Sequence, residues 1–96
     1  MVIVKTYGSV NKDAGWNYLE LRIRGKKISL EKVLKLAVLK DQRSMFDLIA
    51  SEKGLKENYA IFLCGRLIWQ PVDLQMQIHS GDELLILDFP FTIGGG

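Results

Sequence analysis

The chain of 96 residues contains a single cysteine, Cys64, and a single histidine, His79. One cysteine cannot build the disulfide framework that stabilises many small secreted domains, so we expect a reducing, cytoplasmic environment. Cys64 has no partner histidine near its predicted turn, which favours a passive thiol over a nucleophile. His79 has no second ligand at metal-binding spacing, so we expect a turn residue and no metal site.

Long apolar runs and a strong charge of one sign are also missing. No run approaches the roughly 18 residues of a membrane span, and the apolar residues 1–4, interrupted at Lys5, are too few for a signal peptide. The 13 basic and 11 acidic residues leave a scattered net charge of +2, which argues against direct binding of nucleic acid. Trp16 with Arg22 and Arg24 could stack on bases, but neighbouring acidic residues favour a solvated face.

What the chain does contain is enough apolar sequence for one small core, with 48% hydrophobic and 25% charged residues. Residues 2–7 are β-branched and aromatic, which is typical of a strand, and a turn is expected over residues 8–15. In residues 16–24 apolar and polar side chains alternate, as in a half-buried strand. The two runs predict an N-terminal hairpin.

Two helices are expected in the middle of the chain. Ser29 is placed as an N-cap, and apolar residues from Leu30 to Ala37 follow it at helical spacing. Residues 41–43 should end this helix. A second, short helix capped by Ser44 should end at Gly54. Its inward side chains are expected to be Phe46, Ile49 and Ala50.

The last third predicts strands over residues 59–63, 67–69 and 83–89. A tight turn at Cys64-Gly65 joins the first two strands, and Asp82 should cap the turn that precedes the third. Asp82 and Glu83 then point to opposite sides, which argues against a carboxylate dyad. The third run is almost continuously apolar, which predicts a central strand. Its second face would need a cover of long side chains or a partner protein.

Three glycines, Gly94, Gly95 and Gly96, end the sequence. A segment without side chains can pass through a narrow channel and adopt backbone angles closed to other residues. A free α-carboxyl on it would be ionised at neutral pH, because its ordinary pKa lies near 3.5. Such a carboxylate is a nucleophile that an enzyme could join to a nucleotide phosphate. A glycine run here can also be a cloning remnant or a frayed end.

The order strand-strand-helix-strand-strand with a central last strand is that of the α+β, ubiquitin-like β-grasp fold, a mixed sheet on one main helix. Within this order, Phe62-Leu63-Cys64-Gly65-Arg66, the turn His79-Ser80-Gly81-Asp82-Glu83-Leu84, Phe89-Pro90 and the terminal glycines resemble the MoaD/ThiS family of small sulfur carriers. The strand at residues 2–7 and the helix start at residues 29–34 are similar as well. The resemblance implies a ubiquitin-like domain over residues 1–90 and a C-terminal tail over residues 91–96.

The same resemblance implies a mechanism. A ubiquitin-activating-type adenylating enzyme would use ATP to convert the carboxylate of Gly96 to an acyl-adenylate, with Gly94 and Gly95 threaded into its active site. Sulfide or an enzyme persulfide would displace AMP and leave a thiocarboxylate. The chain would be a co-substrate rather than an enzyme, without a bound cofactor. In the most similar branch, the small subunit of molybdopterin synthase, the second partner is the synthase large subunit.

Docking onto such partners would use the outward face of the last strand. The candidates are Leu85, Leu87, Phe89 and Phe91, with Trp69 as a further one, because large apolar side chains make good interface anchors. For the two leucines, filling the core is an equal alternative.

Two departures from the family pattern leave the pathway open. The tail has a third glycine, so the reactive carboxylate belongs to Gly96, or to Gly95 after trimming. Pro90-Phe91 stands where molybdopterin-type carriers tend to have Pro-Pro. The alternatives are a ubiquitin-related modifier for tRNA thiolation, with a sulfurtransferase as partner, a modifier for protein conjugation, and a non-catalytic ubiquitin-like binding module.

Overall fold

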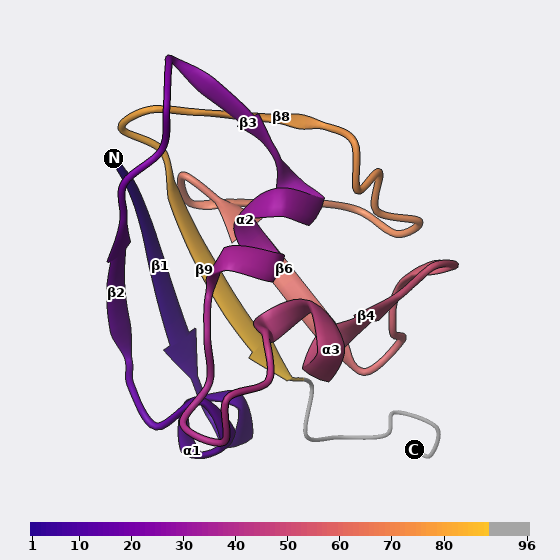
Figure 1. The fold of residues 1–96 in the computed structure, drawn as a ribbon. Helices are drawn as coiled ribbons and strands as arrows, with labels where there is room; N and C mark the ends of the chain where they lie inside the picture. Colours follow the sequence, from indigo (N-terminus) through magenta and orange to yellow (C-terminus); the bar gives the residue numbers. More distant parts are fainter. Residues whose placement is uncertain (89–96) are drawn as a thin grey trace.

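A five-stranded mixed sheet forms one layer of the computed structural model, which describes residues 1–88 (Figure 1). The strand order is β2-β1-β9-β6-β7, so the last strand lies at the centre, as the apolar run predicts. β9 runs parallel to β1 and antiparallel to β6. The strands span Val2–Tyr7 (β1), Tyr18–Leu21 (β2), Tyr59–Leu63 (β6), Arg66–Leu67 (β7) and Glu83–Asp88 (β9).

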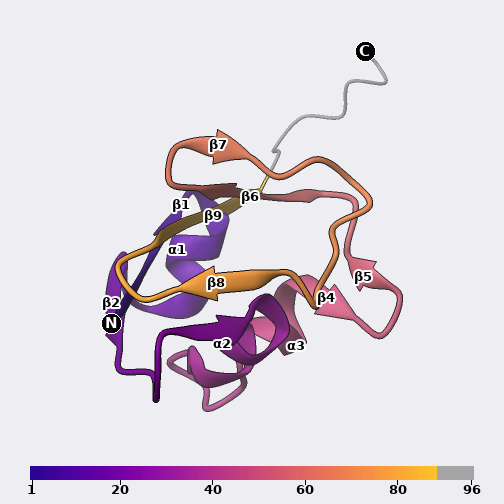
Figure 2. The same ribbon diagram turned by 90° about the horizontal axis from the view of Figure 1, so that it is seen from above.

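Two helices, α2 (Leu30–Leu36) and α3 (Met45–Ile49), lie on one side of this sheet (Figure 2). Both begin where the sequence predicts, because the Ser29 and Ser44 hydroxyls accept hydrogen bonds from backbone N–H groups in the first turn. The core between helices and sheet is formed by fully buried side chains. Its largest members are Leu30, Leu34, Met45, Ile49, Ile61, Ile78, Leu84 and Ile86.

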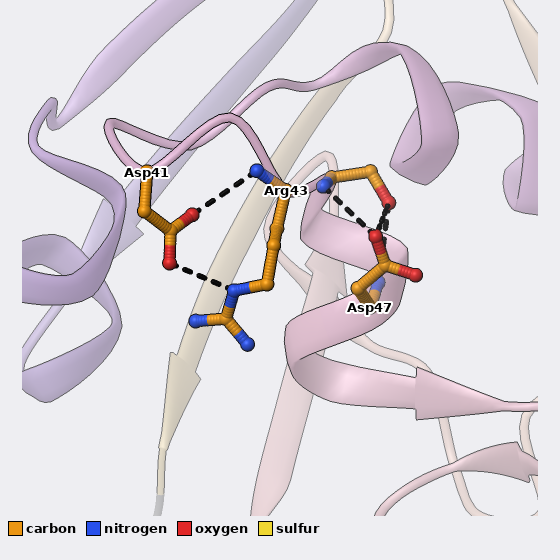
Figure 3. Close-up of polar contacts among 4 residues, drawn as sticks. Asp41, Arg43 and Asp47 are labelled. Carbon is orange, nitrogen blue, oxygen red and sulfur yellow. Dashed lines mark hydrogen bonds and ion pairs between the residues drawn. The ribbon is translucent and has the colours of Figure 1, made fainter.

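The connection between the two helices is held by short-range polar contacts (Figure 3). The Asp41 carboxylate accepts hydrogen bonds from Arg43 N at 3.1 Å and from Arg43 Nε at 2.7 Å. This pair lowers the pKa of the Asp41 carboxyl and raises that of Arg43. At the start of α3, Ser44 and Asp47 form a reciprocal capping box. Residues 41–43 therefore separate the helices, as expected.

Three local expectations are wrong. Residues 8–15 are not a simple turn, because they contain the helix α1 (Ser9–Ala14), whose Val10 and Ala14 are buried in the core. The second predicted strand shortens to Tyr18–Leu21. α3 ends at Ile49 instead of Gly54 because β4 (Ala50–Ser51) and β5 (Gly54–Leu55) pair as a small hairpin.

Short strands account for the remaining differences. β3 (Lys27–Ser29) pairs with β8 (Gln77–His79), and neither strand is predicted from the sequence. The predicted strand at residues 67–69 is reduced to β7. With β1 and β9 parallel at the centre of a mixed sheet and one helical layer against it, the chain has the ubiquitin-like β-grasp fold. No helix within residues 1–88 is long and apolar enough to cross a membrane.

Candidate functional site

The alternation of side chains along β9 decides which residues can meet a partner. Leu84 and Ile86 are fully buried beneath the helices, whereas Leu85 and Leu87 point to the opposite face and are half-buried. Successive side chains of a strand alternate between the two faces of its sheet. Neither leucine belongs to the buried core, so both are available on the outward face, and their role in a partner interface stays a prediction.

Strand register adds two aromatic side chains beside the leucines. Leu85 is paired with Phe62 on β6, and Leu87 with Tyr7 on β1. Tyr7 is 70% exposed and Phe62 is half-buried. We call these four residues, Tyr7, Phe62, Leu85 and Leu87, the apolar patch. It occupies the face of the sheet opposite α2 and α3.

A polar region adjoins the patch on the same face. Lys5 Nζ lies 3.2 Å from Glu83 Oε1, and the Tyr18 hydroxyl donates to Glu20 Oε2 at 2.9 Å. The hydrogen bond to Glu20 is the main cause of the raised pKa of the Tyr18 phenol, because the phenol must lose the proton that it donates in order to ionise. The face therefore has the arrangement of many protein interfaces, an apolar centre beside polar groups.

Trp69, the further interface candidate, is 78% exposed just beyond β7. It lines a shallow groove of about 230 Å³ together with Ala60, Leu67 and Ile68. Ala60 is paired with Leu87, so the groove adjoins the apolar patch through β6. The indole is thus placed where it could extend a contact surface that begins on β9.

Asp88, the last residue of β9, is held by contacts with the start of α1. Its carboxylate accepts hydrogen bonds from Ser9 N at 3.0 Å and from the Ser9 hydroxyl at 2.6 Å. The hydrogen bond from the Ser9 hydroxyl is the main cause of the lowered pKa of Asp88. Gly8 has φ +74°, and a Cβ there would lie 2.7 Å from Asp88 Oδ1. The end of β9 is therefore closely packed against the start of α1.

The remaining predicted site residues lie outside the described part of the chain. These residues are Phe89 and Phe91 of the expected interface, the threading residues Gly94 and Gly95, and the reactive Gly96. The expected domain boundary between residues 90 and 91 also lies outside the described residues.

Four residues that the sequence does not favour as functional, Cys64, His79, Asp82 and Glu83, have the following contacts in the structure. Cys64 occupies the turn between β6 and β7 with φ +49°, and its Sγ lies 3.6 Å from Asp82 Oδ1. Asp82 caps its turn as predicted, accepting a hydrogen bond from His79 N at 2.7 Å. Glu83 is paired with Lys5, away from Asp82. Within residues 1–88 there is no group of three His, Cys, Asp or Glu side chains that could hold a metal ion.

Sequence reasoning did not identify Tyr7, Phe62 or the Ser9–Asp88 contact as parts of the site. Phe62 could have been found, because the sequence predicts a strand at residues 59–63 and successive side chains of a strand face opposite sides, so Phe62 must face away from its neighbour Ile61. The contact between Ser9 and Asp88 has no such signal, since 79 residues separate its partners.

Two crystal structures from Haloferax volcanii have the same fold. The chain superposes on H. volcanii small archaeal modifier protein 1 with a TM-score of 0.67 and 15% identity, over 91% of this chain and 94% of that chain. It superposes on SAMP1 from Haloferax volcanii with a TM-score of 0.68 and 15% identity, over 99% of this chain and 98% of that chain. No family model and no curated protein matches the sequence. At this identity the similarity establishes the fold alone.

Proposed function

We propose that this chain is a ubiquitin-like carrier whose C-terminal glycine carboxylate is adenylated by a ubiquitin-activating-type enzyme and then converted to a thiocarboxylate. The observation that carries the proposal is the position of β9. This strand is the centre of the sheet, presents Leu85 and Leu87 outward, and leads after Asp88 to the sequence that ends in three glycines. The proposed docking face on β9 is thus followed in the sequence by a terminus without side chains.

The division of roles follows from that arrangement. The apolar patch would contact the activating enzyme while Gly94, Gly95 and Gly96 reach its active site, since three extended residues span roughly 10 Å. Attack of the Gly96 carboxylate on the α-phosphate of ATP releases pyrophosphate and forms the acyl-adenylate. Sulfide then attacks the acyl carbon and expels AMP, which leaves the thiocarboxylate. The carrier supplies docking and position, and holding reactive groups in place can contribute about 7 kcal/mol or more.

Within this chemistry we favour the small-subunit role in molybdopterin synthase, in the biosynthesis of the molybdenum or tungsten cofactor. A large subunit would receive the thiocarboxylate there. The support is the family resemblance of the Gly81-Asp82-Glu83 turn, the final strand and the glycine terminus.

A second candidate is a protein modifier, in which a lysine amine replaces sulfide as the nucleophile. The two structural neighbours favour it, since one of them is itself described as a modifier protein. Both candidates use the same acyl-adenylate, so they differ only in the step that follows.

The test is the intact mass of the chain after incubation with ATP, its host's adenylating enzyme and sulfide. We expect a gain equal to one oxygen replaced by one sulfur, and none in a variant that lacks Gly95 and Gly96. Fragmentation of the product would show whether Gly95 or Gly96 carries the sulfur. An unchanged mass, with an enzyme shown to be active on another carrier, would contradict the proposal and favour a ubiquitin-like binding module.

The two fates are separated by a second reaction that contains host proteins but no sulfide. Covalent adducts joined through the terminal glycine to lysine side chains, found by mass spectrometry of proteolytic fragments, would establish the modifier. In a separate reaction, the purified thiocarboxylate product is mixed with the synthase large subunit and its substrate. Return of the carrier to its original mass, with its sulfur found in the product of the synthase and without such adducts, would establish the synthase role.

A further inference from the structure

A second surface of the molecule, remote from the glycine terminus, has the features of a peptide-binding groove. It lies between the end of β2, the strand β3 and one side of α2, with a volume of about 620 Å³. Sites that bind compact ligands or peptide side chains commonly have about 300–1,000 Å³. The side chains that matter are Arg22, Ile23, Arg24, Ile28, Lys32 and Leu36.

The floor of the groove is aliphatic. Ile23 and Ile28 are half-buried and pack against the core, and Leu36 is 43% exposed although it is a large apolar side chain. Leu36 lies one helical turn beyond Lys32 on α2, so the two share a face of the helix. An exposed leucine beside two half-buried isoleucines offers apolar surface that a partner can cover.

The rim of the groove is cationic. Arg22, Arg24 and Lys32 are exposed, and none of them forms an ion pair with another side chain of residues 1–88. Lys26 and Lys27 add two more positive charges in the same stretch of chain. Glu31 is the sole acidic residue between positions 22 and 32, and its carboxylate is already bound by Lys35 and Gln75.

Next to the groove lies a free strand edge. β2 is at one end of the sheet order, and β1 is its only neighbour among the described strands. Thr6 N donates to Asn17 O at 3.2 Å, so Asn17 and every second residue after it turn their backbone groups toward β1. The backbone N–H and C=O groups of Tyr18 and Glu20 therefore face outward, where an added strand could bind them.

We infer that this groove binds an extended peptide segment of a partner protein, in which β-branched apolar residues adjoin a run of acidic residues. The peptide would add a strand to the edge of β2, place its apolar side chains on Ile23, Ile28 and Leu36, and set its carboxylates beside the rim cations. A nucleic acid fits less well, because single-stranded chains stack their bases on aromatic rings and none of the described residues that line the groove is aromatic.

This site goes beyond the proposed carrier function because it lies at the other end of the sheet. β2 ends at Leu21, which is paired with Val2 at the start of β1, whereas Asp88 lies past the pairing of Leu87 with Tyr7 at the end of β1 (Figure 1). A partner in the groove would leave the apolar patch and the glycine terminus accessible. It would therefore recruit the carrier to a complex without blocking its activation.

The experiment uses the full 96-residue chain and a fluorescein-labelled peptide, Val-Ile-Val-Asp-Asp-Asp, in both chain directions, followed by fluorescence anisotropy. The matched probe is Val-Ile-Val-Asn-Asn-Asn. We expect the acidic peptide to bind roughly tenfold more tightly at low salt and to lose most of that advantage at about 300 mM salt. Amide chemical-shift changes should be concentrated in residues 18–36.

Variants then assign the site. Arg24→Ala combined with Lys32→Ala should weaken binding of the acidic peptide by roughly tenfold, and Leu36→Ala should weaken both peptides. The matched control is Lys12→Ala combined with Lys53→Ala, which removes two exposed cations elsewhere and should change affinity by less than about twofold. All of these side chains are exposed, so a folded variant is expected, and its amide spectrum verifies it.

Several results would overturn the inference. They are chemical-shift changes confined to the apolar patch, equal loss of affinity in the control variant, or the absence of binding by either direction of the acidic peptide at millimolar concentration. Tighter binding of a single-stranded oligonucleotide than of the peptide, lost in the same Arg24 and Lys32 variant, would assign the groove to nucleic acid instead. None of these readouts involves Gly95 or Gly96, so absence of peptide binding would leave the carrier proposal intact. Likewise, failure of the carrier to be adenylated would leave the peptide-binding proposal intact.

Discussion

At the scale of single residues, the close approach of Asp88 to Gly8 joins the end of β9 to the residue that follows β1. Gly8 combines a positive φ with the close approach of a carboxylate oxygen, so both its backbone and its missing side chain are required. Asp88 is held in turn by Ser9, one residue further along the chain. Three neighbouring groups thus join the end of β1 to the end of β9.

We predict that Gly8→Ala lowers the free energy of unfolding by about 1–3 kcal/mol, because alanine is strained at this backbone conformation and its methyl group would displace the Asp88 carboxylate. Urea denaturation followed by circular dichroism measures the change. Gly25→Ala is the matched control, since Gly25 also has a positive φ but nothing lies within 4 Å of its added Cβ. If the two variants lose the same stability, the contact with Asp88 contributes nothing.

The Asp88 carboxyl also predicts a pH dependence. Its pKa is lowered in the folded state, mainly by the Ser9 hydroxyl, so its contribution to stability is present above the unfolded-state pKa of about 3.9 and is lost as pH falls through the folded-state value. We expect Ser9→Ala to raise the pKa of Asp88 toward its ordinary value, measured by carbon-detected NMR titration. The stability difference between wild type and Ser9→Ala should shrink below that pH range. A difference independent of pH would show that the hydroxyl acts through something other than the carboxylate.

At the scale of elements, β9 carries two functions on its two faces. Ile86 and Leu84 complete the core, whereas Leu85 and Leu87 belong to the apolar patch. Substitutions at adjacent positions of one strand should therefore affect different properties. The alternation of side chains along the strand makes this separation possible, and the register with β1 places Tyr7 beside Leu87 and the buried Thr6 beside Ile86.

Under the carrier proposal, Leu85→Asp combined with Leu87→Asp should lower kcat/KM for adenylation by at least roughly tenfold, because charged groups would be buried at the contact with the activating enzyme. Ile86→Ala should instead lower the free energy of unfolding by about 2–5 kcal/mol, as deletions from a packed core do. Val38→Asp, at a 49% exposed valine outside the patch, is the control for adenylation. Equal rates for wild type and the double variant would remove the patch from the docking surface.

At the scale of the whole molecule, the two proposed surfaces lie at opposite ends of β1 and should act independently. Sites without shared partners usually show additive energies. We therefore predict that Arg24→Ala with Lys32→Ala changes kcat/KM for adenylation by less than about twofold. Removal of Gly95 and Gly96 should likewise leave peptide affinity unchanged. A measured coupling larger than this between groove and terminus would indicate that one partner excludes the other or that the sheet transmits the effect.

Much of the fold could be predicted because its signals are local. The caps at Ser29 and Ser44 act over three residues, and the turn at Cys64-Gly65 is defined by two positive φ values. The apolar run of β9 predicts a central strand, and the sheet order confirms it, although only the face with Leu84 and Ile86 is fully buried. The wrong expectations concern α1 and the pairs β3–β8 and β4–β5, where short segments acquire structure from packing rather than from their own periodicity. Helices and strands of that length are marginal in isolation.

By itself, the sequence determined the order of the main strands and of α2 and α3, the central strand, the single core and the glycine terminus, because each depends on residue type and spacing along the chain. Tertiary structure alone decided what lies side by side. The pairing of Leu87 with Tyr7 and the hydrogen bonds from Ser9 to Asp88 both join segments distant in sequence. Register and packing create these surfaces, since they follow from the common burial of one core and have no counterpart in any single stretch of residues.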